Sequence, residues 1–396
     1  MSERKTTLIF REILGCNKGV ENYNYWNIKL HYSTGVFDKI IFVTSDTNIK
    51  KDDFNEGEFD IKNYYQINSK ISSKFYKLFK LIIADLKFLW LLISTRGKKS
   101  ILLNVYGLKF YEIILLSLVR IVSRGKVYIL LHDLKRLDEA AFDPTLSAYK
   151  KIEYSLIYKL VDTVLVHSYP IIDAIKSNNL PTEKVTYIPH WDFPSFMDDA
   201  PVQPSKRIAA ITDSNAEIKF LFIGQINHNK GLSVLLKAID IVVNKQFKNF
   251  KVFIFGKSKK TFSTAVLHEY IKEHNLEDYV LFMDEFVPED EMTPIISACD
   301  VLLIPYTYIY NSGSILRFLA YRKPILHSDL PSFQELLSGY EVGRSFINND
   351  ENDFSEAIIS LLSDKDLDKY KDQINLWFER KYDFNEHVGY LKAIMA

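Results

Sequence analysis

Small and cationic residues surround one short turn in the C-terminal half of the chain. A strand-like apolar run over residues 220–223 leads into Gly224, and Lys230 and Gly231 stand where a helical pattern begins. A lysine ammonium can reach phosphate oxygens as a point charge, and a glycine lets a ligand approach the backbone. Lys230 could also be an ordinary solvated lysine and Gly224 an ordinary turn former. The order of strand, turn and helix favours a phosphate site.

A second group of small polar residues opens a later helical pattern. Asn311, Ser312, Gly313 and Ser314 precede an apolar run of helical character. A helix that starts among them would present free N–H groups and the positive end of its dipole to a diphosphate. Serine and glycine are also favoured simply as helix caps, and the two interpretations are compatible. We therefore predict that this segment and the first turn together bind a diphosphate.

Histidines in the first half carry the remaining candidate chemistry. His132 follows the apolar run 128–131, and its imidazole could donate to a sugar hydroxyl or polarise developing charge; bonding to nearby backbone is the alternative. Asp133 could act as a general base in an inverting reaction, although capping of the next helix is favoured. His190 could line a site or hold a hinge.

The sequence carries no signature of a metal site or of a serine nucleophile. The histidines are scattered, and the pair Asp366 and Asp368 is more typical of a solvated charge cluster than of a metal clamp. No Gly-x-Ser-x-Gly elbow follows a strand, so a Ser-His-Asp triad cannot be assigned. We therefore predict no bound metal and no cofactor.

The elements that must position these residues repeat in two similar halves. The chain has 396 residues, which suits two domains. Strand-like runs alternate with helical patterns in each half, which predicts an α/β fold of two doubly wound parallel sheets with ligands at the carboxyl ends of the strands. Strands are expected at residues 7–10, 39–43, 100–104, 127–131 and 163–166, and then at 219–223, 250–255, 280–282, 301–304 and 324–327.

A proline-containing segment without periodicity separates the two halves. We predict an N-terminal domain over residues 1–195, a linker over 196–216 and a C-terminal domain over 217–380. The last segment, residues 381–396, has a helical pattern. We expect this helix to return to the N-terminal domain.

The composition indicates a globular protein of the cytoplasm. Its 50 basic and 50 acidic residues cancel, so no general affinity for nucleic acid is expected. Cys16 and Cys299 are too few and too far apart for a secreted disulfide scaffold. The first residues do not form a signal-peptide pattern, and no segment has the length of a transmembrane helix.

The strongest amphipathic pattern lies over residues 73–93. Apolar side chains recur there at helical spacing, while Lys77, Lys80 and Lys87 share another face. A basic, aromatic-rich helix of this kind can lie on an anionic lipid surface, and basic residues within 120–126 add positive charge to the same domain. The alternative is a helix packed on the sheet with its lysines in water. Contact with a membrane would be peripheral only.

In their order along the chain, these motifs resemble those of a GT-B fold glycosyltransferase, most closely the large retaining family 4. Members of that family usually carry a turn of the form Gly-Arg-x-x-x-x-Lys-Gly, and here residues 224–231 retain the lysine but place Gln225 at the arginine position. Further matching segments are Phe255-Gly256, Phe286-Val287-Pro288, Ala298-Cys299-Asp300, Ile304-Pro305, Arg322-Lys323-Pro324-Ile325, Leu131-His132-Asp133, Val166-His167-Ser168 and Ile188-Pro189-His190. Gly19-Val20-Glu21 resembles the family's N-terminal glycine loop only loosely.

This resemblance implies two Rossmann-like domains that face a central cleft, with a nucleotide-diphosphate sugar on the second domain and the acceptor on the first. It implies a retaining, metal-independent hexosyltransferase of surface polysaccharide assembly, whose acceptor is a carbohydrate or a lipid-linked glycan. Such an enzyme would work in the cytoplasm, at the inner face of the cell membrane. His132 would be its catalytic residue. Further donor contacts are expected at Gln225, Phe286, Val287, Arg317 and Glu335.

One motif of that family is not retained. Its paired glutamates would fall at Ile309 and Arg317 if the segment 323–324 fixes the register. Neither residue is acidic, although Arg317 could supply the cation that is missing at Gln225. Two alternatives therefore stay open. One is a non-catalytic partner subunit that binds nucleotide sugars, and the other is a nucleotide-sugar epimerase on the same fold.

Overall fold

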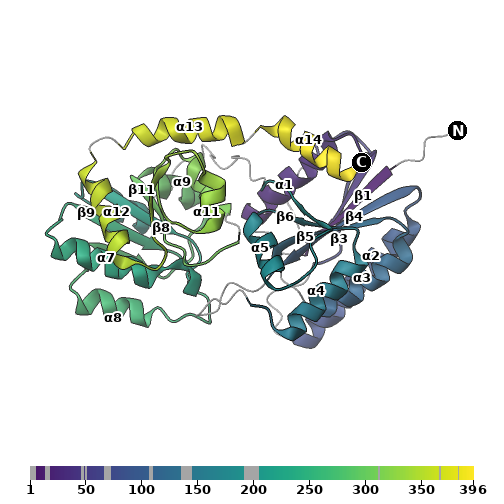
Figure 1. The fold of residues 1–396 in the computed structure, drawn as a ribbon, viewed down its shortest axis with the longest axis horizontal. Helices are drawn as coiled ribbons and strands as arrows, with labels where there is room; N and C mark the ends of the chain where they lie inside the picture. Colours follow the sequence, from purple (N-terminus) through teal and green to yellow (C-terminus); the bar gives the residue numbers. More distant parts are fainter. Residues whose placement is uncertain are drawn as a thin grey trace. The chain divides into compact units, whose positions relative to one another are not determined.

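The computed structural model describes residues 6–13, 18–45, 49, 51–66, 73–106, 110–134, 145–190, 205–310, 313–364, 367–381 and 383–396, with backbone only for residues 18–20. These residues form two compact units (Figure 1). Unit 1 contains the described residues within 1–136, 143–193 and 383–396, and unit 2 contains those within 194–382. Each unit is an α/β domain with its own parallel sheet, which confirms the expected fold class.

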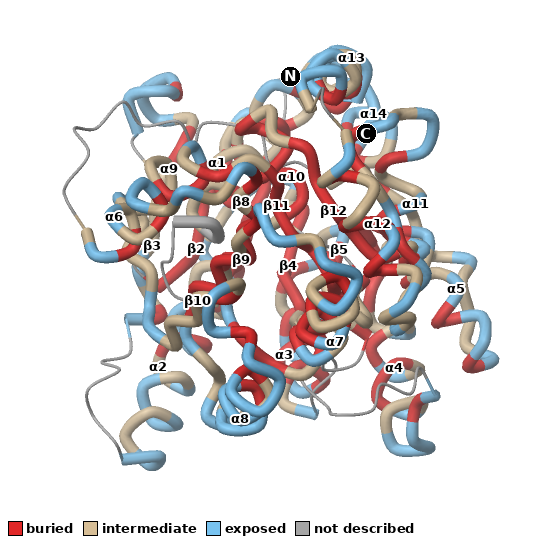
Figure 2. Tube along the Cα trace, turned by 90° about the vertical axis from the view of Figure 1, so that its left-hand side faces the viewer, coloured by how far each residue is buried: buried red, intermediate tan, exposed pale blue. Residues whose placement is uncertain are grey.

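The sheet of unit 1 has seven parallel strands in the order β3-β2-β1-β4-β5-β6-β7. The strands are β1 (Thr6–Arg11), β2 (Lys39–Thr44), β3 (Phe59–Asn63), β4 (Lys98–Tyr106), β5 (Lys126–Asp133), β6 (Thr163–Val166) and β7 (Val185–Tyr187). The central strands β1, β4 and β5 are buried along almost their whole length, as Figure 2 shows for β4 and β5. This burial is typical of a parallel sheet with helices on both faces.

In the described part of unit 1, six helices lie around this sheet. They are α1 (Lys18–Ser33), α2 (Lys74–Ser94), α3 (Phe110–Ser123), α4 (Ala148–Leu160), α5 (Tyr169–Ser177) and α14 (Phe384–Met395). Helix α3 packs against both α2 and α4, and α14 packs against α1. The rings of Trp26 and Phe384, 6.1 Å apart, join α1 to α14. The C-terminal helix therefore belongs to unit 1.

The sheet of unit 2 has six parallel strands in the order β10-β9-β8-β11-β12-β13. The strands are β8 (Ile218–Ile223), β9 (Phe250–Phe255), β10 (Val280–Met283), β11 (Val301–Ile304), β12 (Ile325–Ser328) and β13 (Gly343–Phe346). The helices are α6 (Lys206–Thr212), the 3-10 turn η1 (His228–Lys230), α7 (Leu232–Asn244), α8 (Ala265–Glu273), α9 (Glu289–Ser297), α10 (Gly313–Ala320), α11 (Pro331–Leu337), α12 (Glu351–Ser363) and α13 (Lys369–Lys381). The loops after β8, β9, β11 and β13 begin at the carboxyl edge of this sheet, where such folds bind ligands.

The predicted linker over residues 196–216 is wrong in its second half. Residues 206–212 form α6, which packs against α9 within unit 2. The Ser205 hydroxyl accepts from the Ile208 N–H and caps this helix, and Ile211 is fully buried. A helix of only seven residues between polar turns is too short to show a helical period in the sequence. The first part of the predicted linker lies outside the described residues.

Candidate functional site

Glycines allow the predicted phosphate turn to follow β8 and to lead into α7. Gly224 has a φ of 149°, and a Cβ on it would meet no atom within 4 Å. Gly231 has a φ of 66°, and a Cβ on it would lie 1.7 Å from the carbonyl oxygen of Pro305. A side chain is therefore excluded at Gly231, whereas the space beside Gly224 is open to a ligand.

Hydrogen bonds hold this turn against the segment that follows β11. The Thr307 N–H donates to the Asn229 carbonyl at 3.0 Å, and the Asn229 side-chain amide donates to the Tyr308 carbonyl at 2.8 Å. The Asn348 amide, beyond β13, donates to the Thr307 carbonyl at 2.9 Å. Three separate loops are thus fixed together at one edge of the sheet.

Lys230 is the cation of this edge. Its Nζ lies 3.5 Å from the centroid of the Tyr306 ring. In the described part of the chain, Lys230 takes part in none of the ion pairs of unit 2. An aromatic face attracts an ammonium group without neutralising its charge. The positive charge therefore stays available to an anionic ligand.

The second predicted phosphate segment begins α10. Gly313 and Ser314 form its first turn and are half-buried, whereas Asn311 and Ser312 lie outside the described residues. The first N–H groups of a helix have no partner within the helix. The loop that leads to α10 is the one whose Thr307 contacts the phosphate turn. The described part of the second segment, Gly313 and Ser314, therefore follows a loop that contacts the predicted phosphate turn.

Arg317 lies on α10 and forms an ion pair with Glu289, the first residue of α9. The idea that Arg317 replaces the cation missing at Gln225 is therefore not supported, because a carboxylate already neutralises its guanidinium. Gln225 itself is exposed. Glu335 lies within α11 and is half-buried. Whether Gln225, Arg317 and Glu335 contact the donor stays a prediction.

A buried arginine that was missed by sequence reasoning supports the loop before α9. Arg207 of α6 is only 5% exposed, and it donates to Glu285, to Glu291 and to the carbonyl of Phe286 at 3.0–3.1 Å. The Phe286 side chain is 73% exposed, and Val287 beside it is half-buried. An exposed ring on a fixed backbone could stack on a flat ligand.

A cavity of about 560 Å³ adjoins the turn within unit 2. Its lining is largely polar and includes Asn227 and His228 of the turn, Ser233 of α7, and Tyr308. The volume is in the range of small-molecule sites. Lys230 does not line this cavity, so the cavity lies beside the predicted diphosphate site.

In unit 1, three histidines and a tyrosine gather near the carboxyl ends of the strands. His132 lies at the end of β5, where the pairing with β4 shifts register, and its ring stacks on Tyr106 at 4.4 Å. Its ring is 5.6 Å from that of His167, which is 4.8 Å from that of His190. The Tyr23 ring lies within 5.3–5.6 Å of all three imidazoles. His132 and His190, predicted separately, therefore belong to one histidine cluster.

Buried hydrogen bonds hold the Tyr106, His167 and Tyr23 side chains of this region in place. The Tyr106 hydroxyl donates to Glu12 at 2.7 Å, and the Asn104 amide donates to the same carboxylate oxygen at 2.5 Å. The His167 Nδ1 lies 3.1 Å from the Ile188 carbonyl, which can only accept, so this nitrogen carries the proton. The other nitrogen of His167 then accepts from the Tyr23 hydroxyl at 2.7 Å.

Burial keeps all three imidazoles neutral. It lowers the pKa of His132 well below 6.5, assisted by His167, and it lowers the pKa of His190 similarly, assisted by both other histidines. Burial also lowers the pKa of His167 to about 4, against the effect of its backbone hydrogen bonds. Neutral imidazoles both donate and accept hydrogen bonds, which suits hydroxyl groups better than phosphate.

The capping role expected for Asp133 stays a prediction, because residues 135–144, which follow it closely, lie outside the described part of the chain. Asp133 lies within β5, and the next described helix, α4, is capped by Ser147, whose hydroxyl accepts from the Lys150 N–H at 3.3 Å.

Within the described ranges, no group of three or more histidine, cysteine or acidic side chains is placed to hold a metal ion. None of the described helices combines the length and the apolar character needed to cross a bilayer.

Residues 217–364 match the family described as glycosyl transferases group 1. No curated protein matches the sequence significantly. Among solved structures, sucrose-phosphate synthase from Thermosynechococcus elongatus is similar with a TM-score of 0.69 and 14% identity over 98% of both chains. A glycosyltransferase from Rickettsia africae is similar with a TM-score of 0.68 and 14% identity over 99% of this chain and 98% of that one. Anabaena HepE in complex with UDP and glucose has a TM-score of 0.66 and 14% identity over 98% and 99%.

Proposed function

Because residues 217–364 match the group 1 glycosyl transferase family and the chain has a GT-B fold, we propose that the protein transfers a sugar from a nucleotide-diphosphate donor. The proposed acceptor is a carbohydrate or a lipid-linked glycan of surface polysaccharide assembly. The transferred sugar is a hexose, and its configuration is retained. The reaction requires no metal and takes place at the inner face of the cell membrane. These finer features are supported only by the resemblance of the motifs.

The observation that carries the proposal is the environment of Lys230. Its ammonium group lies over the Tyr306 ring and has no carboxylate partner among the described residues of unit 2. The loop against which this turn is held leads into α10, whose first N–H groups point along the helix axis. A cation and a helix N-terminus on adjoining loops suit the two phosphates of a nucleotide-diphosphate sugar.

In the proposed reaction, the bond between the sugar and the diphosphate breaks, and the nucleoside diphosphate leaves with an added negative charge. Lys230 and the N–H groups of Gly313 and Ser314 stabilise that charge as it develops. His132 contacts the donor sugar through a neutral imidazole, held in place by the stacked ring of Tyr106. A hydroxyl of the acceptor forms the new bond to the sugar, and its proton passes to the departing diphosphate.

Donor binding can be tested by thermal shift with UDP, GDP and their sugars. A ligand that binds only the folded state raises the melting temperature. UDP and UDP-glucose come first, because HepE, a protein of the same fold, was solved with each. We expect one nucleotide to stabilise the parent and the Lys272→Ala control, an exposed lysine on α8, but not Lys230→Ala. No shift with any nucleotide would contradict the proposal.

A non-catalytic nucleotide-sugar-binding subunit is the second candidate. It is favoured by Ile309 and Arg317 at the positions of the paired glutamates, and by the engagement of Arg317 with Glu289. Incubation of the identified donor with a panel of glycan acceptors distinguishes the two. Release of nucleoside diphosphate, or a glycosylated product, supports the transferase, whereas donor binding without either supports the binding subunit. Conversion of the donor to an epimer would instead identify an epimerase.

A further inference from the structure

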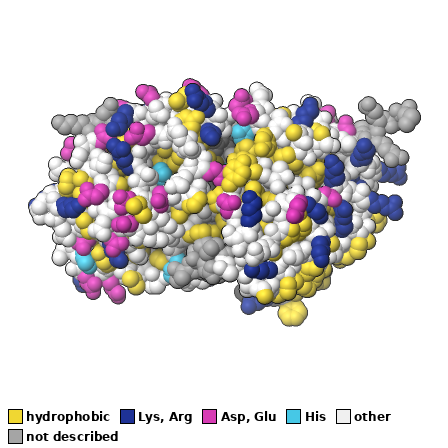
Figure 3. Space-filling view, viewed as in Figure 1, with side chains coloured by type: hydrophobic (Ala, Val, Ile, Leu, Met, Phe, Trp, Pro, Cys, Tyr) yellow, Lys and Arg dark blue, Asp and Glu magenta, His cyan; other side chains and the backbone are white. Residues whose placement is uncertain are grey.

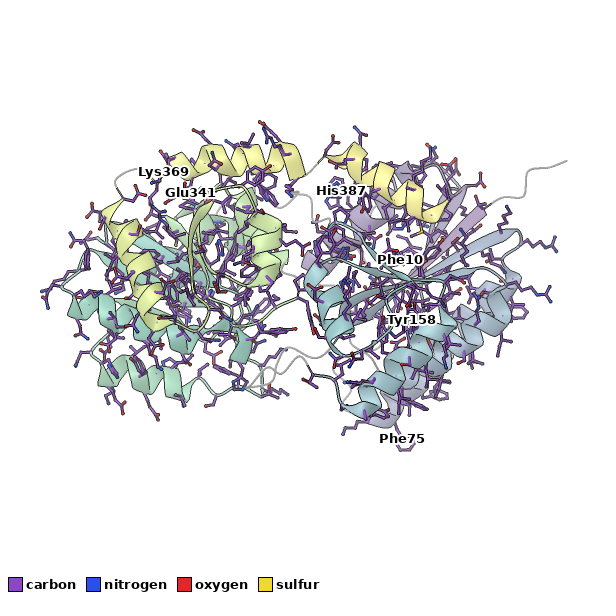
Figure 4. The ribbon with its side chains drawn as sticks, in the orientation of Figure 1. Phe10, Phe75, Tyr158, Glu341, Lys369 and His387 are labelled. Carbon is purple, nitrogen blue, oxygen red and sulfur yellow. The ribbon has the colours of Figure 1, made fainter. Side chains whose placement is uncertain are left out.

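Helix α2 exposes an apolar stripe along its outer side. The large apolar residues of this stripe are Phe75, Leu78, Phe79, Ile82, Leu86 and Trp90. Phe75 is 88% exposed and projects away from the ribbon (Figure 4), and Trp90 is 69% exposed. Their spacing of three and four residues places them on one side, whereas Ala84, Phe88 and Leu92 are buried in unit 1. The exposed apolar residues therefore do not contribute to the core of unit 1.

The two helices beside α2 continue the same surface. Helix α3 packs against both α2 and α4, and the three lie side by side (Figure 1). Exposed apolar residues repeat on α3 at Phe110, Ile114, Leu118 and Ile121, and on α4 at Tyr149, Ile152 and Leu156. We call this surface of three helices the apolar face of unit 1. In Figure 3, hydrophobic side chains gather over these helices with Lys and Arg side chains near them.

The charges on these helices are segregated by sign. The sequences of α2, α3 and α4 contain three carboxylates, Asp85, Glu112 and Glu153, and each is at least nine-tenths buried. Asp85 and Glu112 face inward to the buried guanidinium of Arg11. In contrast, the basic side chains stand at the surface, among them Lys74, Lys80, Lys87 and Lys159. The exterior of the three helices is therefore apolar and cationic, with no exposed acid.

This combination fits a lipid surface better than a protein surface. Lysine is depleted in protein–protein interfaces, where arginine is enriched. The one arginine of the three helices, Arg120, is engaged by Asp162 in a two-point ion pair. Lysine stems can lie along apolar groups while their ammonium groups reach lipid phosphates. Exposed Trp90 and Tyr149 are the residue types that prefer the boundary between headgroups and acyl chains.

We propose that the apolar face of unit 1 docks the protein on an anionic lipid bilayer. The apolar side chains of α2, α3 and α4 enter the headgroup boundary, and the lysines of α2 and α4 contact the anionic headgroups. The contact is peripheral, since none of the described helices can cross the bilayer. The proposed lipid-binding surface includes the predicted amphipathic segment 73–93 and adds α3 and α4 to it. It requires none of the residues assigned to donor binding, so it stands apart from the proposed transfer.

The test is flotation of the full chain with vesicles of phosphatidylcholine alone or with about one-third phosphatidylglycerol, at low and high salt. We expect the bound fraction to be at least about tenfold higher on the anionic vesicles at low salt, and to fall as salt screens the charges. Phe75→Ser with Trp90→Ser should remove binding even at low salt. Lys80→Glu with Lys87→Glu should remove the preference for anionic lipid. Because these side chains are exposed, the variants should keep the parent melting temperature.

Val266→Ser, at an exposed apolar residue of α8 in unit 2, is the matched control and should bind vesicles like the parent. Failure of the parent to bind either vesicle would overturn docking. Docking would also be overturned if the parent formed a dimer without lipid and the double variant Phe75→Ser with Trp90→Ser did not, since the apolar face would then bind a second copy of the chain. Donor-induced thermal shifts should be equal in the parent and the face variants. Loss of vesicle binding with an intact donor shift would therefore separate docking from the proposed transfer.

Discussion

The Nζ atom of Lys230 lies 3.5 Å from the centroid of the Tyr306 ring, and Gly231 beside it approaches the carbonyl of Pro305. Both contacts join the turn after β8 to the segment after β11. The lysine is thus held by an aromatic face and not by a carboxylate. Its charge is positioned before any ligand arrives, which reduces the cost of ordering the side chain on binding.

Lys230→Met should weaken binding of the nucleotide-diphosphate donor while it leaves the fold intact. A hydrogen bond to a charged group contributes about 1.5–3 kcal/mol, so the Kd should rise roughly 10- to 150-fold. Isothermal titration with the nucleotide identified by thermal shift measures this change. Lys272→Met on α8 should leave the Kd unchanged. Equal affinities for the parent and Lys230→Met would remove Lys230 from the donor site.

Gly231→Ala should lower the unfolding free energy of unit 2 by more than the strain of a positive φ alone would. Alanine at Gly339, which has a φ of 86° and no atom within 4 Å of a new Cβ, should cost only about 1–2 kcal/mol of unfolding free energy. At Gly231 the new Cβ also collides with backbone, and we expect a loss above about 3 kcal/mol. Urea unfolding of both variants measures the difference. Similar losses would mean that the collision is relieved by a small shift of Pro305.

The long buried strands could be predicted from the sequence, but three of the four strands at the sheet edges could not, β10 being the one that was predicted. The predicted run 219–223 matches β8 within one residue, because both faces of a central parallel strand are apolar. The edge strands β3, β7 and β13 were missed. Strand β13 has a half-buried Arg344 and an exposed Ser345 between two buried residues. An edge strand that carries polar residues lacks the continuous apolar run that marks a buried strand, whereas the edge strand β10 has such a run.

Residues of the candidate site were predictable where their role is local. A glycine at a positive φ and a lysine before a helix leave a signature within a few positions, as at Gly231 and Lys230. Tyr306, Tyr23 and Arg207 act through contacts with residues far along the chain, so no local pattern indicates them. Their roles required the tertiary structure.

Arg207→Met should destabilise unit 2 by about 2–3 kcal/mol of unfolding free energy. Arg207 is buried and pairs with the half-exposed Glu285 and with Glu291, whose side chain is only 15% exposed, so its removal leaves the Glu291 carboxylate poorly compensated. The adjacent Lys206 also pairs with Glu285, but at the surface, so Lys206→Met should cost below about 1 kcal/mol. Chemical denaturation measures both losses. Equal costs would show that Arg207 contributes no more than a surface pair.

His167→Gln should make the protein less sensitive to mild acid. The folded-state pKa of His167 is about 4 and its unfolded value is about 6.5, so between these pH values the unfolded chain binds more protons. The stability of the parent is therefore full above about pH 6.5 and declines as the pH falls towards 4. The titration of His167 alone should lower the unfolding free energy by about 2 kcal/mol between pH 7.5 and 5.

Glutamine does not titrate, yet its amide oxygen can still accept from the Tyr23 hydroxyl. Unfolding free energies of parent and variant at both pH values should therefore differ in their pH dependence by about that amount. An identical loss in both would mean that His167 titrates normally in the folded protein.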